Sequence, residues 1–378
     1  MKLREITRSS KTIKEFIYFI KIFFDLFIET LSYLYQKVFF QELSILEINH
    51  LVSRIESMEQ QKVDVVFTWA NEYDNDWNSS LKKHLKQNES KNESRAQMED
   101  KCEARYRSCD TLESAINSVL THFKDLRNIY VVSTGNPPSF ISENKSIKWI
   151  RHEDIFPSKE DYLPTFNALS IEAFLHKIPG LSDYFIFIND DVIISKPCSF
   201  KDFFCDNKPI YRLSERFIPY TLMSFRILRG RDLDGSLFAV LRANRKLHKR
   251  YKSSGNWLLS HAPQPFYLPS FIRIRKLYEF IYDRGAKEKF RSKKHLSITN
   301  HLVPWALYLE NQAIMKPKPL FSADALLTSS KIMNFYTTIK TYFSSEIYFS
   351  VQDSSGVTTE EYKKIFNLLQ KKYKESLK

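Results

Sequence analysis

Two adjacent carboxylates, Asp190 and Asp191, follow the apolar segment Tyr184–Ile188 and the amide of Asn189. Oxygen ligands of this kind suit a hard cation such as Mg²⁺ or Mn²⁺. An Asp-Asp pair is also common in ordinary turns, and by itself it is weak evidence. Its position directly after an uncharged strand favours a metal site with Asp190 and Asp191 as ligands.

A histidine and an arginine further along the chain have the side chains needed for proton and phosphate chemistry. His261 lies in the loop sequence Ser260–Pro263, and a loop histidine can act as a general base near neutral pH. Arg291 stands among lysines, and a guanidinium can hold phosphate oxygens through paired hydrogen bonds. Either residue alone is typical of a solvated surface, so the hypothesis requires that the fold bring both to the acidic pair.

Four cysteines form two pairs, Cys102 with Cys109 and Cys198 with Cys205, and each pair encloses six residues. Zinc-binding pairs usually enclose two to four residues. The spacing therefore favours reduced thiols over a four-thiolate zinc site, which stays as the alternative.

Apolar, β-favouring segments alternate with helical ones through the first half of the chain. Strands are expected at 61–69, 128–132, 147–151 and 184–189, and helices at 167–176 and after Asp110, which is placed as an N-cap. This alternation predicts an α/β fold with a Rossmann-like, doubly wound, mostly parallel sheet.

Polar residues follow three of the predicted strands. Asn71 and Asp74 come after the first, Thr134–Asn136 after the second, and Asn189–Asp191 after the fourth. In doubly wound sheets, ligands bind beyond the carboxyl ends of the strands. We therefore expect the three clusters to meet in one crevice.

The 378-residue chain is 43% apolar and 15% aromatic, which excludes a disordered protein. Residues 226–294 carry 18 Lys and Arg against 5 Asp and Glu, a difference equal to the whole net charge of +13. Such a region is either a solvated basic face or a binding surface for an anion. A nucleic-acid-binding protein would leave the acidic strand-end cluster without a role, so we expect no nucleic-acid partner.

Residues 13–40 are rich in Phe, Ile, Leu and Tyr, but charged residues interrupt every stretch long enough to cross a bilayer. At helical spacing one narrow stripe is polar and the rest of the surface is apolar. Such a helix either packs on the protein's own core or lies in the plane of a membrane. The polar stripe consists of Lys14, Lys21, Asp25, Glu29, Ser32 and Gln36.

These patterns divide the chain into four predicted regions. They are an N-terminal amphipathic helical segment (1–60), an α/β core (61–205), a basic, mainly helical insertion or lid carrying His261 and Arg291 (206–300), and a return to the core with a C-terminal amphipathic helix (301–378).

Four blocks of the sequence resemble the Stealth family of sugar-phosphate transferases, which includes bacterial capsule-polymer hexose-1-phosphate transferases and an animal N-acetylglucosamine-1-phosphotransferase. The most specific block runs from Arg105 to Asp191 and contains several motifs in order. Its motifs are Arg107 and Asp110, Arg127–Val132, His152–Pro157, Tyr162–Asn167 and His176–Leu181. The other blocks are Val63–Trp69 with Asn71 and Asp74, the surroundings of His261 and Arg291, and a faint block at Gln352-Asp353.

The resemblance implies a glycosyltransferase-A-like core that transfers a sugar-1-phosphate from a UDP-sugar to a hydroxyl of a growing capsular or cell-surface polysaccharide. UMP would leave and a phosphodiester would form. The alternative is a metal-dependent glycosyltransferase that releases UDP. The implied location is the bacterial cytoplasm, with residues 13–40 as a possible peripheral contact to the inner membrane.

The resemblance also implies roles for the candidate residues. Asp190 and Asp191 would hold Mg²⁺ or Mn²⁺, and His261 would accept the proton of the acceptor hydroxyl. The basic 226–294 region would bind the anionic polysaccharide. Asp110, Arg107 and Arg291 complete the predicted catalytic set, and Trp69, Asn71, Asp74, Asn167 and Asn189 form the predicted donor-binding set.

Overall fold

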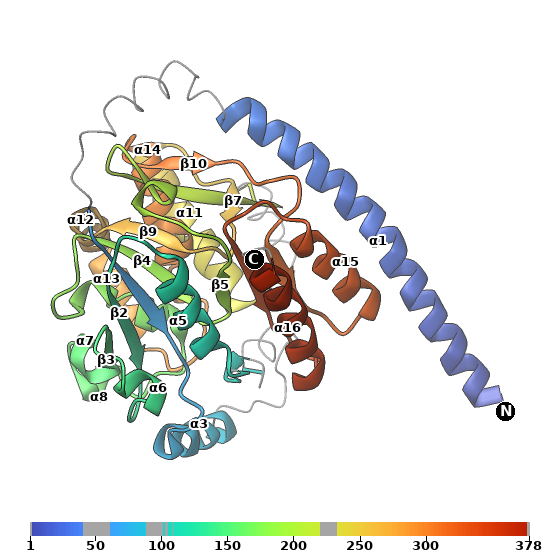
Figure 1. Cartoon of the computed structure of the whole chain (residues 1–378), viewed down its shortest axis with the longest axis horizontal. Helices are drawn as coiled ribbons and strands as arrows, with labels where there is room; N and C mark the ends of the chain where they lie inside the picture. The colour runs from blue at the N-terminus through green and yellow to red at the C-terminus, as the bar shows by residue number, and fades with distance from the viewer. Residues whose placement is uncertain are drawn as a thin grey trace.

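The structure is a computed structural model that describes residues 2–40, 61–87, 101–102, 105–107, 109–219 and 233–375 (Figure 1). Its central sheet has five strands in the order β3-β2-β1-β4-β9. Strands β1 to β4 are parallel, and β9 pairs antiparallel with β4. The predicted α/β fold with a mostly parallel sheet is confirmed. The bounds are β1 Val63–Thr68, β2 Leu126–Ser133, β3 Ile147–Arg151, β4 Tyr184–Asn189 and β9 Gln264–Tyr267.

Alternate residues of the central strands enter two separate cores, because successive side chains of a strand point to opposite faces. In β1, Val65 and Phe67 belong to one core and Val66 to the other. Helices α5 (Thr111–His122) and α16 (Thr359–Glu375) contribute to the first core. The second core contains residues of α11 (Gly235–Tyr251), α12 (Leu268–Leu277) and α14 (Val303–Leu309).

Two smaller sheets adjoin the central one. In the first, β7 (Lys208–Phe217) pairs with β6 (Phe204–Cys205), β8 (Trp257–Leu259) and β10 (Ile314–Lys316). In the second, β12 (Tyr348–Gln352) pairs with β11 (Asp324–Leu326) and β5 (Val192–Ile194). Strand β9 comes from the 206–300 region and forms an edge of the central sheet, so this region takes part in the core. Further helices are α3 Asn75–Gln87, α6 Ser139–Ser142, α7 His152–Ile155, α8 Lys159–Tyr162, α9 Ala168–Glu172, α13 Glu279–Ala286 and α15 Lys331–Tyr342.

The N-terminal helix α1 (Lys2–Phe40) packs on the body through its polar stripe rather than its apolar face. Of its side chains that the structure describes, the buried ones are Glu29, Ser32 and Gln36. Gln36 donates to the carbonyl of Ser214 at 2.9 Å and accepts from the backbone N–H of Lys318 at 2.9 Å. The predicted helix is therefore present, with its orientation set by polar contacts. Residues 41–60 of the predicted segment lie outside the described residues.

A buried ion cluster holds this helix against the body. The carboxylate of Glu29 lies 2.6 Å from Lys340 Nζ and 3.6 Å from Lys318 Nζ, and all three side chains are at most 10% exposed. We expect Glu29→Gln to destabilise the contact of α1 with the body by about 3 kcal/mol, because two buried ammonium groups lose one of the two carboxylates, Glu29 and Glu215, that compensate their charge. Amide hydrogen exchange across residues 26–36 measures this, with Thr30→Ala on the exposed face as control. Unchanged protection in Glu29→Gln would contradict the expectation.

A buried histidine makes stability depend on acidity. Burial lowers the pKa of His301 to about 3, and its Nε2 pairs with Asn244 Oδ1 at 2.6 Å. In the unfolded chain His301 therefore binds a proton below about pH 6.5, whereas in the folded chain it binds one only below about pH 3. His301 thus contributes stability that is present above pH 6.5 and is lost as the pH falls toward 3.

We expect His301→Gln to reduce the pH dependence of the unfolding free energy by about 1.4 kcal/mol per pH unit between pH 6 and pH 4. Urea titrations of the two proteins across this range supply the comparison. Parallel curves for wild type and variant would show that His301 does not titrate as described.

Candidate active site

The carboxyl ends of β1, β2 and β4 open into one cavity of about 580 Å³. Its wall contains Asn71, Thr134 and the Asn189–Asp191 segment, one from each of the three predicted clusters. The amide of Asn71 donates to the carbonyl of Thr134 at 2.9 Å, which joins the first cluster to the second. The predicted meeting of the three clusters is confirmed.

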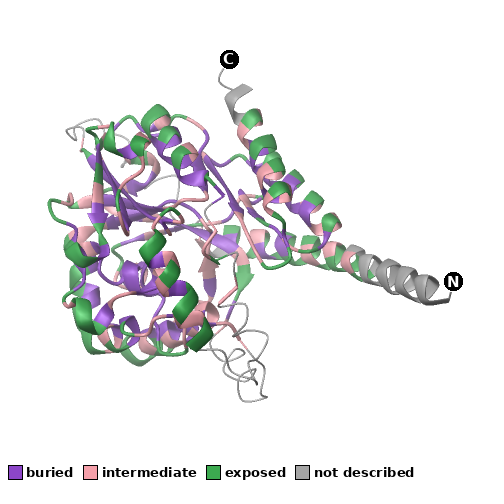
Figure 2. Cartoon of the chain, turned by 90° about the horizontal axis from the view of Figure 1, so that it is seen from below, coloured by how far each residue is buried: buried purple, intermediate pink, exposed green. Residues whose placement is uncertain are grey.

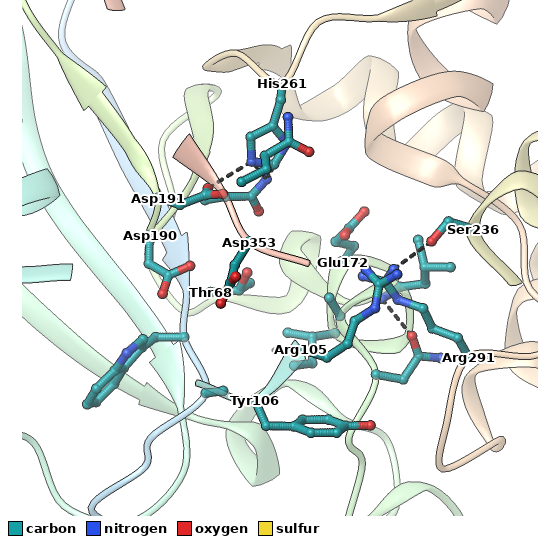
Figure 3. A pocket seen from close by; sticks show the side chains of 18 of the residues that line it. Thr68, Arg105, Tyr106, Glu172, Asp190, Asp191, Ser236, His261, Arg291 and Asp353 are labelled. Carbon is teal, nitrogen blue, oxygen red and sulfur yellow. Dashed lines mark hydrogen bonds and ion pairs between the residues drawn. The ribbon is translucent and has the colours of Figure 1, made fainter. Parts of the chain in front are cut away.

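Asp190 and Asp191 occupy the turn between β4 and β5, on one side of this cavity (Figure 3). Burial, and then the charge of Asp191, raise the pKa of Asp190 to about 8. Two carboxylates held this close repel each other, and a cation between them would remove that cost. Among the described residues no group of three or more His, Cys, Asp or Glu forms a metal site. The pair fits a cation that takes its other ligands from substrate phosphates, as Mg²⁺ commonly does.

His261 lies in the loop between β8 and β9 and contacts the acidic pair directly. Its Nε2 is 2.8 Å from Asp191 Oδ1, and its backbone N–H donates to Asp324 Oδ2 at 3.1 Å. Burial disfavours the charged ring, but the nearby Asp191 carboxylate outweighs it and raises the pKa of His261 to about 9. The fold therefore brings this residue, 70 positions away in sequence, to the acidic pair.

The side of the cavity opposite the acidic pair carries arginines (Figure 3). Arg291 lines it and donates to Ser236 Oγ at 2.6 Å. Arg105 lies on the same side, whereas Arg107 lines the cavity beside Asp353, to whose Oδ2 it donates from Nε at 3.0 Å. A bound anion would thus meet guanidinium groups at one end and, through a cation, carboxylates at the other.

Trp69 and Thr134 border the cavity with buried polar atoms that have no hydrogen-bond partner among the described residues. The same is true of His152 and Thr165. Buried donors and acceptors of this kind are normally satisfied, so their grouping at one end of a cavity is typical of a ligand site. A second cavity of about 220 Å³ shares Thr134, His152 and Thr165 with the first.

Two predicted site residues, Asp74 and Asn167, also begin helices. Asp74 lines the smaller cavity, and its Oδ1 accepts from the N–H groups of Asp76 and Trp77, both at 3.1 Å, at the start of α3. Asn167 lines the main cavity, and its Oδ1 accepts from Leu169 N–H at 3.1 Å at the start of α9.

Asp110 is not among the residues that line either cavity. Helix α5 begins directly after it, as expected, but its backbone is left-handed (φ 60°) and its side chain makes no capping hydrogen bond. The carboxylate instead lies 2.6 Å from Lys363 Nζ of α16 and accepts from Tyr73 Oη at 2.9 Å. Asp110 was predicted to help hold the donor or the metal, but its carboxylate is not among the groups that line the cavity.

The structure adds site residues that the sequence interpretation does not propose. Burial raises the pKa of Glu172 to about 7, against a hydrogen bond from Thr299 and the charge of Arg291. Asp353 follows β12 directly, and the strand-end rule used for the other clusters would have identified it once that strand was recognised. Arg105 begins the most specific Stealth block, whereas Asp324 gives no comparable signal in the sequence. Glu172, Asp353 and Arg105 line the cavity, and Asp324 supports His261.

The four cysteines are free, and Cys109 and Cys198 are buried. Burial raises the pKa of Cys109 to about 11 and that of Cys198 to about 12, which disfavours the thiolate that zinc requires. The cysteines show no sign of a zinc site in the part of the chain that the structure describes.

Residues 105–211, which include the acidic pair and Arg107, match the family description "Stealth protein CR2, conserved region 2". The resemblance to the Stealth family is confirmed. Capsular polysaccharide phosphotransferase cps1A of Actinobacillus pleuropneumoniae is 29% identical, over 78% of this chain and 80% of that protein. The capsular polysaccharide phosphotransferase fcs1 of Haemophilus influenzae is also 29% identical, over 81% of this chain and 82% of that protein. SacB of Neisseria meningitidis is 31% identical over 67% of this chain, a match that spans 44% of SacB.

The names of these relatives give the predicted enzyme class, a phosphotransferase. Among solved structures, the galactosyltransferase LgtC is 10% identical with a TM-score of 0.37, over 81% of this chain and 96% of that one. Such a likeness is too distant to add to the fold described above.

Proposed function

We propose that this Stealth protein transfers a sugar-1-phosphate from a UDP-sugar to a hydroxyl of a capsular polysaccharide and releases UMP. The observation that carries the proposal is the cavity in which Asp190 and Asp191 face Arg291, with His261 in contact with Asp191. Phosphoryl transfer requires charge neutralisation at the diphosphate and an acceptor placed in line, and this cavity offers groups for both. Sequence similarity to capsular polysaccharide phosphotransferases supports the same reaction class.

In the proposed reaction the acceptor oxygen forms a bond to the phosphorus that carries the sugar. The bond from that phosphorus to the bridging oxygen breaks, and the bridging oxygen leaves with UMP. His261 accepts the proton of the acceptor hydroxyl, and Arg291 and Arg107 stabilise negative charge on the transferred phosphate. The product is a phosphodiester between sugar and acceptor.

Asp190 and Asp191 would hold Mg²⁺ or Mn²⁺, which would offset the negative charge of the donor phosphates. The two carboxylates are hard oxygen donors that line the cavity, and burial, followed by the charge of Asp191, raises the pKa of Asp190. When Asp191 has another partner, His261 loses the contact that raises its pKa, and its ring becomes able to accept a proton near neutral pH.

The nucleotide part of the donor would lie beyond the ends of β1 and β2. Trp69 and Asn71 line this end, and Asp74 lines the adjoining smaller cavity. The buried polar atoms of Trp69, Thr134 and Thr165 have no protein partner in the described residues and would gain one from a bound base or ribose.

Helix α11 lines the cavity with Ser236, Leu237 and Val240 and carries a basic surface further along its length. Burial, and then the nearby Arg242, Lys249 and Arg245, lower the pKa of Lys246, so these side chains repel one another. An anionic polymer would relieve this repulsion. We expect Arg245→Gln combined with Lys249→Gln to raise KM for a phosphodiester-linked acceptor about tenfold at low salt, with kcat unchanged. Both side chains are exposed. An unchanged KM would remove the basic surface from acceptor binding.

The deciding experiment identifies the nucleotide product. Purified protein with Mg²⁺ is incubated with a panel of UDP-sugars and short capsule-type acceptors, and the released nucleotide is analysed. UMP that appears only with acceptor supports the proposal and identifies the donor. UDP would indicate a metal-dependent glycosyltransferase instead, and no release with any donor would contradict the UDP-sugar proposal.

The proposed setting is the bacterial cytoplasm at the inner membrane, with residues 13–40 as a peripheral contact. In the described part of the chain no helix is both long and apolar enough to cross a bilayer.

A further inference from the structure

Helix α1 presents its apolar side to solvent. Phe23, Phe24 and Phe27 are 60–66% exposed, whereas the side chains buried against the body are polar. The exposed apolar side chains of α1 are Ile17, Ile20, Phe23, Phe24, Leu26, Phe27, Ile28, Leu31, Leu34, Tyr35 and Val38. A helix on the surface of a soluble protein normally has the opposite arrangement.

Helix α15, almost 300 residues later in the chain, has the same inverted arrangement. Its buried residues are Asn334, Thr337, Thr338, Lys340 and Thr341, all of them polar. Its outer side carries Phe335 and Ile339, followed by Tyr342 and Phe343 at its end. Two helices from opposite ends of the sequence thus bury polar faces and expose apolar ones.

The two helices lie side by side along one flank of the body (Figure 1) and are joined by the ion pair of Glu29 with Lys340. Figure 2 shows exposed residues on the outer sides of both. The exposed apolar side chains of these two neighbouring helices are defined here as the α1/α15 surface. Many exposed apolar side chains on neighbouring helices are typical of an interaction site.

The charges beside this surface identify its partner. From residue 17 onward, the acidic residues of α1, Asp25 and Glu29, are half-buried and buried, while Lys21 and Lys37 are exposed. Upstream, residues 2–14 contain five Lys and Arg and one Glu. Exposed aromatic residues flanked by cations are typical of helices that lie in the interface of an anionic bilayer.

We propose that the α1/α15 surface docks on an anionic lipid bilayer, with α1 in the plane of the membrane and the phenylalanine side chains among the upper acyl chains. The buried cluster of Glu29, Lys318 and Lys340 fixes the helix with its apolar side outward. The inference rests on the membrane location proposed above and not on the chemistry of the cavity.

Flotation of the full-length protein with vesicles tests this surface. Vesicles of phosphatidylglycerol and phosphatidylethanolamine are compared with vesicles of phosphatidylcholine alone. The α1 variant carries Phe23→Ser and Phe27→Ser, and the α15 variant carries Phe335→Ser and Phe343→Ser. The matched control is Phe280→Ser on α13, since this phenylalanine is 80% exposed on another part of the body.

We expect the wild type to float with the anionic vesicles and each double variant to lose at least tenfold in partitioning, because two phenylalanine side chains no longer enter the acyl region. Phe280→Ser should float like the wild type. Equal thermal midpoints and equal turnover of soluble substrates would show that the double variants are folded and that the cavity is unaffected.

Three results would overturn the proposal. They are undiminished flotation of both double variants, an equal loss in Phe280→Ser, and a wild-type dimer that the double variants convert to monomers without any vesicle binding. The last result would assign the surface to a second copy of the chain. None of these results depends on which nucleotide the enzyme releases, so this proposal and the proposed function can fail separately.

Discussion

Asp191→Asn is expected to lower kcat by about 10³-fold while the protein stays folded. The substitution keeps the shape of the side chain but removes the charge that, with Asp190, would hold the cation against the donor phosphates. It also removes the ionic partner of His261, which lies 2.8 Å away. Single-turnover measurements of UMP release, at saturating donor and acceptor, give the chemical step directly.

The matched control is Asp183→Asn. Asp183 precedes β4, at the opposite end of the strand from Asp191, and is exposed. We expect wild-type rates in this control, and a far-ultraviolet circular dichroism spectrum and melting temperature close to wild type in both variants. A kcat of Asp191→Asn within threefold of wild type would exclude Asp191 from the reaction.

His261→Ala is expected to lower kcat by about 10²- to 10⁴-fold, the usual cost of removing a general base. Added imidazole should restore part of the activity, because the ring that it replaces borders an open cavity and is 24% exposed. Rescue should grow with the fraction of neutral imidazole as the pH rises. The comparison is kcat against imidazole concentration at several pH values.

Two further variants separate proton transfer from positioning. His261→Gln can still donate a hydrogen bond to Asp191 but cannot accept the proton, so it should be as slow as the alanine variant. His248→Ala, at an exposed position of α11, should keep the wild-type rate. An active His261→Gln would show that the residue orients Asp191 rather than accepting the proton.

The sequence alone predicted four of the five strands of the central sheet, all but β9, and the place of the acidic pair. Strands β1 to β4 are local runs of apolar, β-favouring residues, and their registers follow from parallel pairing. The carboxyl ends of parallel strands meet at one edge, so Asn71, Thr134 and Asp190 could be brought together without knowledge of the loops. His261 and Arg291 were candidates because of their side-chain chemistry, and the family resemblance supported them, but the local sequence pattern did not predict where they lie.

The tertiary structure decided which polar side chains face the cavity. Arg107 meets Asp353 across 246 residues of sequence, and no local pattern indicates such a pair. Asp110 has the sequence signature of an N-cap, yet its carboxylate pairs with Lys363 on another helix. Long-range ion pairs depend on the packing of whole elements, which residue spacing does not encode.

The N-terminal helix also shows the difference between what the sequence determined and what the tertiary structure decided. Helical periodicity determined that residues 13–40 have a polar stripe and an apolar face, but not which of them faces the body. Burial of the apolar face would ordinarily be favoured by the hydrophobic effect. Here Lys318 and Lys340 are buried beneath the helix, and the carboxylates of Glu29 on the helix and Glu215 on β7 compensate their charge. Because a buried charge without a partner costs more than an exposed apolar side chain, the polar stripe faces inward and the apolar face remains outside.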